Sequence, residues 1–313
     1  MKQSDKKKTK TAVHQKNALI KKNNWFGSNK LPIFVMLLLL VSCVKDDLYN
    51  TPHPDKGAVK ITTDWSRASS DAVLPQSYVL RIGTQEQTVS GEVNAFNTLF
   101  EPGSQDLLVY HQAEGITLTD HTATINTLAD GILNPMPGYL FSGAAELEIV
   151  KDDTLQVIVK MEQRIRSLTL ALKLNPGDEE RIAMTTATLT GIASAIDLRD
   201  GTITAAEGQT TVPTFVLGTN GQRMRSAGEP ALVGTLRLMG IMTGEQQVLT
   251  LKITLTDGSV QTFTADLSEA LKNFDGDMEP LELNASLELP AEGSFTGTII
   301  GWTVVENGQI EIH

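Results

Sequence analysis

The 313-residue chain contains a single cysteine, Cys43, so it cannot form an internal disulfide or a thiolate metal site. Aromatic residues make up only 5% of the sequence, which is little for a surface that stacks against sugar rings. Phosphate-binding loops of the GxxxxGKS/T and GxGxxG types are absent, as is the GxSxG turn of hydrolases. We therefore expect no cofactor and no enzymatic activity.

The histidines and acidic residues show no spacing typical of a metal centre. The histidines after residue 42 are His53, His111, His121 and His313, and none belongs to an HExxH motif. Acidic pairs occur at Asp46-Asp47, Asp152-Asp153 and Asp275-Gly-Asp277. Paired carboxylates can bind calcium or act in acid–base chemistry, but such clusters are also ordinary turn residues. We interpret them as turns and solvated loops, and we predict no catalytic residues and no metal.

The N-terminus has the composition of an export signal. The first thirty residues hold nine lysines and one acid, Asp5, and the apolar run Leu31–Val41 follows them. A basic segment, a short apolar core and a small residue before the cut are typical of secretory signals. The run has eleven residues, whereas a membrane-spanning helix needs about 20. We predict that residues 1–42 form a signal peptide that is removed.

Cys43 lies directly after the apolar run. Leu40-Val41-Ser42-Cys43 resembles the bacterial lipobox, in which the cysteine sulfur is acylated and the chain is cut before it. Two or more acyl chains hold a protein stably on a bilayer, whereas one binds only marginally. We therefore expect Cys43 to be the lipidated first residue and residues 43–56 to form a lipidated acidic tether.

The mature chain is strongly acidic. The full sequence has a net charge of −11, and removal of nine lysines and one acid with residues 1–42 leaves −19. Nucleic-acid binding requires a positive face, so this charge argues against a nucleic-acid partner. The only membrane attachment that the sequence suggests is the lipid on Cys43.

The mature chain shows mainly the period-two pattern of strands. Apolar residues alternate with polar ones in Val59–Trp65, Leu155–Met161, Leu168–Leu174, Leu249–Leu255 and Leu281–Leu289. The pairs Asn220-Gly221, Asp257-Gly258 and Asn307-Gly308 are typical of tight hairpin turns. Residues 249–265 read as one hairpin around Asp257-Gly258. Many short strands without alternating helices indicate an all-β fold built of sandwiches.

One short helix is predicted at Asp266–Phe274. Its spacing places Leu267, Ala270, Leu271 and Phe274 on one face, and Asp266 with Glu269 has the spacing of a capping box. A second helical turn is weakly indicated near Asp178–Met184. We place a domain boundary near Gln163–Arg166, which gives an N-terminal sandwich, 57–163, and a C-terminal sandwich, 164–313, each of ordinary domain size.

Several short motifs together resemble a known family. Cys43-Val-Lys-Asp-Asp-Leu48 is similar to the acidic tag, here Lys45, Asp46 and Asp47, that follows the lipid cysteine in surface-exported lipoproteins of Bacteroidales. The later motifs are His53-Pro54, Asp64-Trp65-Ser66, Tyr78–Ile82, Tyr139–Gly143, Asp152–Thr154, Met161–Arg164, Gly301-Trp302 and Asn307–Ile310. In this order they resemble the FimB-type fimbrial anchor family, minor subunits of type V pili, over nearly all of the mature chain.

The resemblance implies two tandem transthyretin-like Greek-key β-sandwich domains on the outer face of the outer membrane, held there by the lipid. It also implies that fimbrial stalk subunits join by strand addition along an open sheet edge. Such an anchor ties the fimbrium to the cell and limits its length. In stalk pilins an arginine-specific protease removes the first strand with the lipid, whereas an anchor keeps both. Arg67 follows the Val59–Trp65 strand, where such a cut would fall, so it is a candidate protease site; the alternative is an ordinary solvated arginine in a polar loop.

Two other functions remain open from the sequence. The chain could be a stalk or tip pilin that is cut after Arg67, so that its mature N-terminus is Ala68. It could also be a surface lipoprotein that binds glycans, with exposed Trp65 or Trp302 as the stacking residues. The low aromatic content disfavours the glycan partner.

Overall fold

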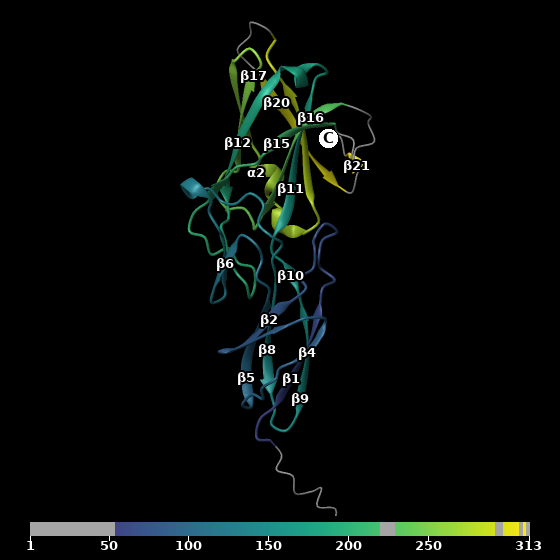
Figure 1. Cartoon of the computed structure of the whole chain (residues 1–313), viewed down its shortest axis with the longest axis vertical. Helices are drawn as coiled ribbons and strands as arrows, with labels where there is room; N and C mark the ends of the chain where they lie inside the picture. The colour runs from purple at the N-terminus through teal and green to yellow at the C-terminus, as the bar shows by residue number, and fades with distance from the viewer. Residues whose placement is uncertain (1–53, 220–228, 292–296, 307–308, 311–313) are drawn as a thin grey trace, which may run out of the picture. The chain divides into compact units, whose positions relative to one another are not determined.

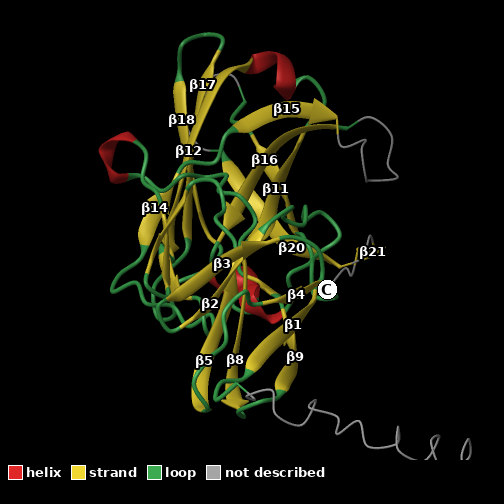
Figure 2. Cartoon of the chain, turned by 60° about the horizontal axis from the view of Figure 1, so that its bottom comes forward, coloured by secondary structure: helices red, strands yellow, loops and turns green. Residues whose placement is uncertain are grey.

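The period-two pattern folds as predicted into strands. The computed structural model describes residues 54–219, 229–291, 297–306 and 309–310, most of which lie in sheets (Figures 1 and 2). The helical segments in these ranges are one α-helix and three 3-10 turns: α2 (Ser268–Leu271), η2 (Ala129–Gly131), η3 (Asp178–Arg181) and η4 (Phe274–Gly276). The predicted all-β class with one short helix is therefore confirmed.

Residues 58–163 provide every strand of two sheets, with strand orders β4-β1-β9 and β10-β8-β5-β2-β3. The strands of the first sheet are β1 (Ala58–Asp64), β4 (Val93–Ala95) and β9 (Thr154–Lys160). Those of the second are β2 (Tyr78–Ile82), β3 (Gln85–Val89), β5 (Gly103–Tyr110), β8 (Phe141–Ile149) and β10 (Glu162–Gln163).

Residues 166–310 provide two further sheets, with orders β15-β16-β11-β19-β20-β21 and β14-β12-β17-β18. The first contains β11 (Arg166–Leu174), β15 (Phe215–Thr219), β16 (Pro230–Leu238), β19 (Leu281–Glu288), β20 (Thr298–Glu306) and β21 (Gln309–Ile310). The second contains β12 (Ile182–Ile192), β14 (Gln209–Thr211), β17 (Val248–Leu255) and β18 (Val260–Asp266). A small sheet joins β6 (Ile116–Thr119) and β7 (Thr122–Ile125) to β13 (Ala195–Asp197).

The same pairing scheme occurs in both parts of the chain. β1 pairs antiparallel with β4 and parallel with β9, and β11 pairs antiparallel with β16 and parallel with β19. Each part thus begins with a strand that lies between an antiparallel and a parallel neighbour. The two parts of the chain are therefore similar in the topology around their first strands.

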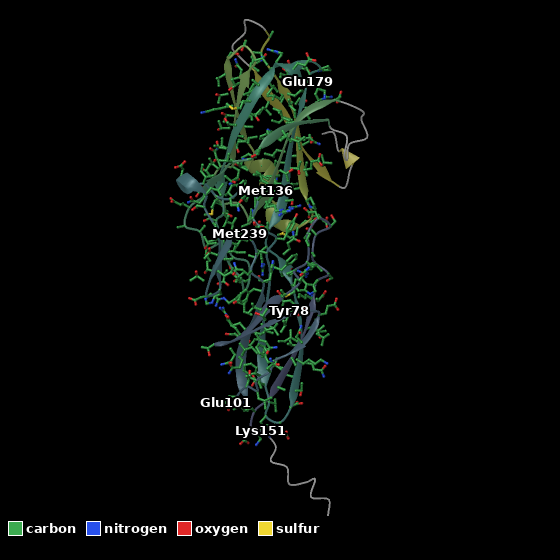
Figure 3. All side chains as sticks on the ribbon, in the orientation of Figure 1. Tyr78, Glu101, Met136, Lys151, Glu179 and Met239 are labelled. Carbon is green, nitrogen blue, oxygen red and sulfur yellow. The ribbon has the colours of Figure 1, made fainter. Side chains whose placement is uncertain are left out.

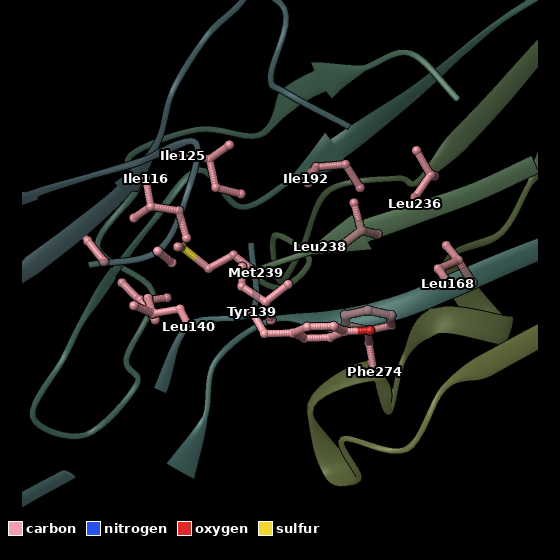
Figure 4. Close-up of a cluster of buried hydrophobic side chains, with 14 of the residues drawn as sticks. Ile116, Ile125, Tyr139, Leu140, Leu168, Ile192, Leu236, Leu238, Met239 and Phe274 are labelled. Carbon is pink, nitrogen blue, oxygen red and sulfur yellow. The ribbon is translucent and has the colours of Figure 1, made fainter. Parts of the chain in front are cut away.

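The core consists of the inward faces of these strands. Val59 and Ile61 of β1, Leu80 of β2 and Leu168 and Leu170 of β11 are almost completely buried. Figure 4 shows Tyr139 and Leu140 in the same buried cluster as Leu168, Leu238 and Phe274. Apolar packing is therefore continuous from residues before Gln163 to residues after it.

The hairpin predicted around Asp257-Gly258 is confirmed. β17 and β18 pair antiparallel from Val248 and Asp266 to Thr254 and Val260. Gly258 has φ of +84°, a conformation that glycine adopts without a steric cost, whereas Asp257 keeps a negative φ. The turns predicted at Asn220-Gly221 and Asn307-Gly308 lie outside the described residues.

The helix predicted at Asp266–Phe274 is shorter than expected. Only Ser268–Leu271 is α-helical, and Phe274–Gly276 forms a separate 3-10 turn. The capping box is not formed, because the Asp266 carboxylate accepts the Ser268 amide hydrogen at 2.9 Å in a local turn. Leu267, Leu271 and Phe274 are nevertheless buried as predicted. The weakly indicated turn near 178–184 is the 3-10 turn η3, and β12 begins directly after it.

The segment at the predicted boundary is buried. Gln163, Ile165 and Arg166 are each less than 10% exposed. The Arg166 guanidinium donates hydrogen bonds to the carbonyl oxygens of Phe274 and Glu279, both at 2.6 Å. The Gln163 side-chain oxygen accepts the Ser69 amide hydrogen at 2.8 Å, so side-chain contacts fix the segment on both sides of residue 164. The division of the chain into domains 57–163 and 164–313 stays a prediction.

Candidate functional site

The predicted lipid and export residues lie outside the described part of the chain. Cys43, Lys45, Asp46 and Asp47 all precede residue 54. Among the described residues, no helix has the length and apolar character needed to cross a membrane. The lipid attachment therefore stays a prediction from the sequence.

β1 is the central strand of its sheet. All seven of its residues, Ala58–Asp64, pair with Thr154–Lys160 of β9, and Lys60–Thr62 also pair with β4. Its inward side chains Val59, Ile61 and Thr63 are buried. The Thr63 hydroxyl lies 3.2 Å from the hydroxyl of Tyr78, which is labelled in Figure 3. Removal of β1 would thus expose buried apolar surface and leave both neighbouring strands without a partner.

Arg67 lies in the turn that follows β1. The Ala68 amide donates a hydrogen bond to the Trp65 carbonyl at 3.1 Å, which closes the turn. The Arg67 guanidinium contacts the Glu162 carboxylate, with Nη1 at 2.9 and 3.1 Å from its two oxygens. The Arg67 side chain is still 56% exposed. A protease could therefore reach the Arg67 side chain from solvent.

The residues after Arg67 are held by hydrogen bonds from distant parts of the chain. The buried Ser69 amide donates to the Gln163 side-chain oxygen at 2.8 Å. The Ser70 amide and hydroxyl donate to the Glu279 carboxylate, the hydroxyl at 2.6 Å. We refer to Ser69–Asp71 as the post-β1 segment.

Asp71 completes the contacts of the post-β1 segment. Its carboxylate accepts hydrogen bonds from the Ser69 hydroxyl at 2.7 Å and from the Tyr139 hydroxyl, which also lies 2.8 Å from the Ser167 hydroxyl. Partial burial acts to raise the pKa of Asp71, but the hydrogen bonds from Tyr139, Ser69 and Ser167 outweigh it and hold the pKa below its usual range. Burial and the bond to Asp71 raise the pKa of Tyr139. Asp71 is therefore ionised at neutral pH as the acceptor of this network.

The two tryptophans proposed as stacking residues are not exposed platforms. Trp65 packs edge-on against Tyr78 and Phe141, with ring centroids 5.6 and 5.5 Å apart, and its indole nitrogen donates to the Thr63 hydroxyl. Trp302 is also partly buried against the core. The expectation that these rings face solvent was wrong, because both contribute to packing.

A hollow of about 580 Å³ lies beside the C-terminal end of β9. It is lined by Gly143 and Ala144 of β8, by Ile158 and Lys160 of β9, and by residues that include Arg164 and Asp200. None of the lining residues is aromatic. The hollow therefore lacks the flat ring surface on which sugars stack.

The described histidines and acids show no metal-binding arrangement. His111 is buried, and its Nδ1 accepts the Phe141 amide hydrogen at 3.3 Å. Burial lowers the pKa of His111, which favours the neutral imidazole. Within the described ranges, no group of three or more potential metal ligands occurs. Asp152 and Asp153 lie in the β8–β9 turn, as predicted, with Asp152 at φ of +58°.

The sequence matches the family described as fimbrillin-A associated anchor proteins Mfa1 and Mfa2 over residues 60–308. This range covers most of the chain, so the chain belongs to that family of fimbrial anchor proteins. The predicted relationship to fimbrial anchors is thereby confirmed. No curated protein sequence gives a significant match.

Several solved structures share the fold. The fimbrial anchor protein Mfa2 from Porphyromonas gingivalis is 8% identical, with a TM-score of 0.53, over 82% of this chain and 98% of the other. A candidate adhesin from Bacteroides ovatus is 11% identical, with a TM-score of 0.57, over 86% and 97% of the two chains. A candidate adhesin from Bacteroides thetaiotaomicron is 13% identical, with a TM-score of 0.53, over 76% and 93%. At these identities the likeness shows a common fold.

Proposed function

We propose that the chain is a surface-exposed outer-membrane lipoprotein that anchors a fimbrium, a type V pilus, to the cell and limits its length. The observation that carries this proposal is membership of the fimbrial anchor family across residues 60–308. The role is structural and requires no catalysis. The predicted signal peptide, the lipid on Cys43 and the acidic tag Lys45-Asp46-Asp47 supply the route to the surface and the attachment.

The proposed partners are fimbrial stalk subunits, joined by strand addition. This mode of binding needs an open sheet edge, because the added strand uses the unpaired main-chain groups of that edge. β1 is paired on both sides over Lys60–Thr62, so an incoming strand cannot take its position while β1 stays in place. A subunit that retains β1 therefore ends the series of joints at that sheet, which accounts for an anchor that also limits length.

The lipid is expected to decide whether fimbriae stay on the cell. In cells that carry Cys43→Ser, the chain lacks its acyl groups, and we expect most fimbriae to appear in the culture medium. The measurement is the ratio of cell-bound to shed fimbriae after sedimentation, with lengths taken from electron micrographs. The matched control is Asp257→Asn, which removes an acid in the β17–β18 turn, about 200 residues along the chain from the tether, and should leave the ratio unchanged. Cell-bound fimbriae of normal length in the Cys43→Ser strain would contradict the anchor role.

The second candidate is a stalk or tip pilin that is cut after Arg67. The exposed Arg67 side chain in a turn directly after β1 is the observation that favours it. The hydrogen bonds of the post-β1 segment oppose it, because the peptide bond to be cut lies between two segments that are tied to the fold. A glycan-binding role has less support, since Trp65 and Trp302 are packed against the core.

A further inference from the structure

The peptide bond between Arg67 and Ala68 lies between two segments that the fold immobilises. On its N-terminal side, β1 is paired along its whole length, and the Asp64 carbonyl accepts the Met161 amide hydrogen at 2.8 Å. On its C-terminal side, the Ser69 amide donates to the side chain of Gln163 in β10, and the Ser70 amide donates to the side chain of Glu279 in the loop before β19. Proteolytic nicking prefers exposed loop tips that can leave the fold. The turn at Arg67 is exposed, but the residues on both sides of it are tied to the rest of the fold.

The acceptors that hold the post-β1 segment are themselves fixed. The Gln163 side-chain amide also donates to the Ile165 carbonyl at 2.7 Å, which sets the direction of its oxygen. The Glu279 main chain is held by the Arg166 guanidinium at 2.6 Å and by the Asp277 carboxylate at 3.0 Å. The Ser70 bonds have a charged acceptor, which strengthens them, and they are exposed to solvent, whereas the Ser69–Gln163 bond is buried and is the contact most protected from water.

We propose that the post-β1 segment, Ser69–Asp71, is a latch that keeps the Arg67–Ala68 bond resistant to arginine-specific cleavage and thereby retains β1 and everything N-terminal to it. Arg67 has the side chain that such a protease selects, but the latch prevents the main chain around the Arg67–Ala68 bond from entering the protease's active site. Cleavage then requires local opening, and its rate follows the population of the open form. The biological meaning of the latch rests on the proposed anchor function, but its existence can be tested without fimbriae.

The test is proteolysis of the mature, full-length protein purified from outer membranes in mild detergent. An arginine-specific protease is added at neutral pH, and mass spectrometry follows the appearance of the peptide that begins at Ala68. We expect the native protein to yield this peptide at least about a hundred times more slowly than a synthetic peptide that spans residues 60–75. Equal rates for the folded protein and the free peptide would overturn the proposal.

Variants locate the effect in the latch. Glu279→Ala removes both acceptor oxygens of Ser70 but keeps the main-chain contacts of Glu279, so cleavage at Arg67 should accelerate about tenfold or more. Ser70→Ala removes only the hydroxyl contact and should give a smaller acceleration. Glu282→Ala is the matched control, because it removes a nearby acid that makes no contact with the latch. An unchanged cleavage rate in Glu279→Ala, or an equal acceleration in Glu282→Ala, would contradict the latch.

Two readouts separate a local effect from general instability and from failure of the anchor proposal. Thermal unfolding of Glu279→Ala should stay close to that of the parent protein; if this variant does not fold, Ser70→Ala and the comparison with the free peptide still decide the question. If the purified protein resists cleavage but Cys43→Ser cells keep their fimbriae, the latch is supported and the anchor role is contradicted. If the purified protein is cleaved as fast as the free peptide but Cys43→Ser cells release their fimbriae, the anchor role is supported and the latch is contradicted.

Discussion

Replacing Ile61 by alanine is expected to lower the free energy of unfolding by about 2–5 kcal/mol, the range for large-to-small substitutions in a close-packed core. Ile61 is fully buried in the middle of β1, with β4 on one side and β9 on the other. Its removal leaves a cavity that two paired strands cannot close. The measurement is the midpoint of urea unfolding followed by circular dichroism.

Ile158→Ala is the matched control for Ile61. Ile158 lies on the neighbouring strand β9, opposite Thr62, but its side chain is 71% exposed. The same loss of atoms there should change the free energy of unfolding by no more than about 0.5 kcal/mol. Equal effects of the two substitutions would mean that β1 does not occupy the central, buried position described above.

Gly143→Ala is expected to destabilise the protein by about 1–3 kcal/mol, near the upper end, because the obstacle is main chain. A Cβ at Gly143 in β8 would lie 2.5 Å from the Lys160 carbonyl oxygen and 2.7 Å from a Val159 methyl group. β8 and β9 could not then approach as closely as they do, and β9 is the parallel partner of β1. The effect should appear as a lower unfolding midpoint and as faster cleavage after Arg67.

The control for Gly143 is Gly218→Ala in β15. A Cβ at Gly218 would meet nothing closer than a Val233 methyl group at 3.9 Å, which is ordinary van der Waals contact. Alanine should be tolerated there with little change in stability. A Gly143→Ala protein as stable as Gly218→Ala would show that β8 and β9 do not make the close approach.

The strands with strict alternation could be predicted, because a strand that buries one face carries apolar residues at every second position. Leu168–Leu174 and Leu281–Leu289 are examples: the first lies wholly within β11, and the second coincides with β19 except for its last residue. β3, Gln85–Val89, carries no such signal, because four of its five residues are polar and only Val89 is buried. At Asp266–Phe274 the apolar spacing was correct, but Asp266 formed a local turn with Ser268, which shortened the helix.

The contacts that define the site could not be predicted, because they join residues far apart in the sequence. The Ser69–Gln163 bond spans 94 residues, and the Ser70–Glu279 bond spans 209. The parallel pairing of β1 with β9 could not be predicted from the sequence either, because periodicity identifies a strand but not its neighbour in the sheet. Arg67 could be selected from its place after the first strand, whereas the latch beside it required the structure.

The measurement that tests the account most directly is mass spectrometry of the N-terminal peptide of the protein in purified, fimbriated outer membranes. We predict a peptide that begins at Cys43 and carries the mass of its acyl groups, because the latch leaves the Arg67–Ala68 bond uncut. A protein whose sequence begins at Ala68 would show that β1 and the lipid are discarded, and it would identify the chain as a processed pilin.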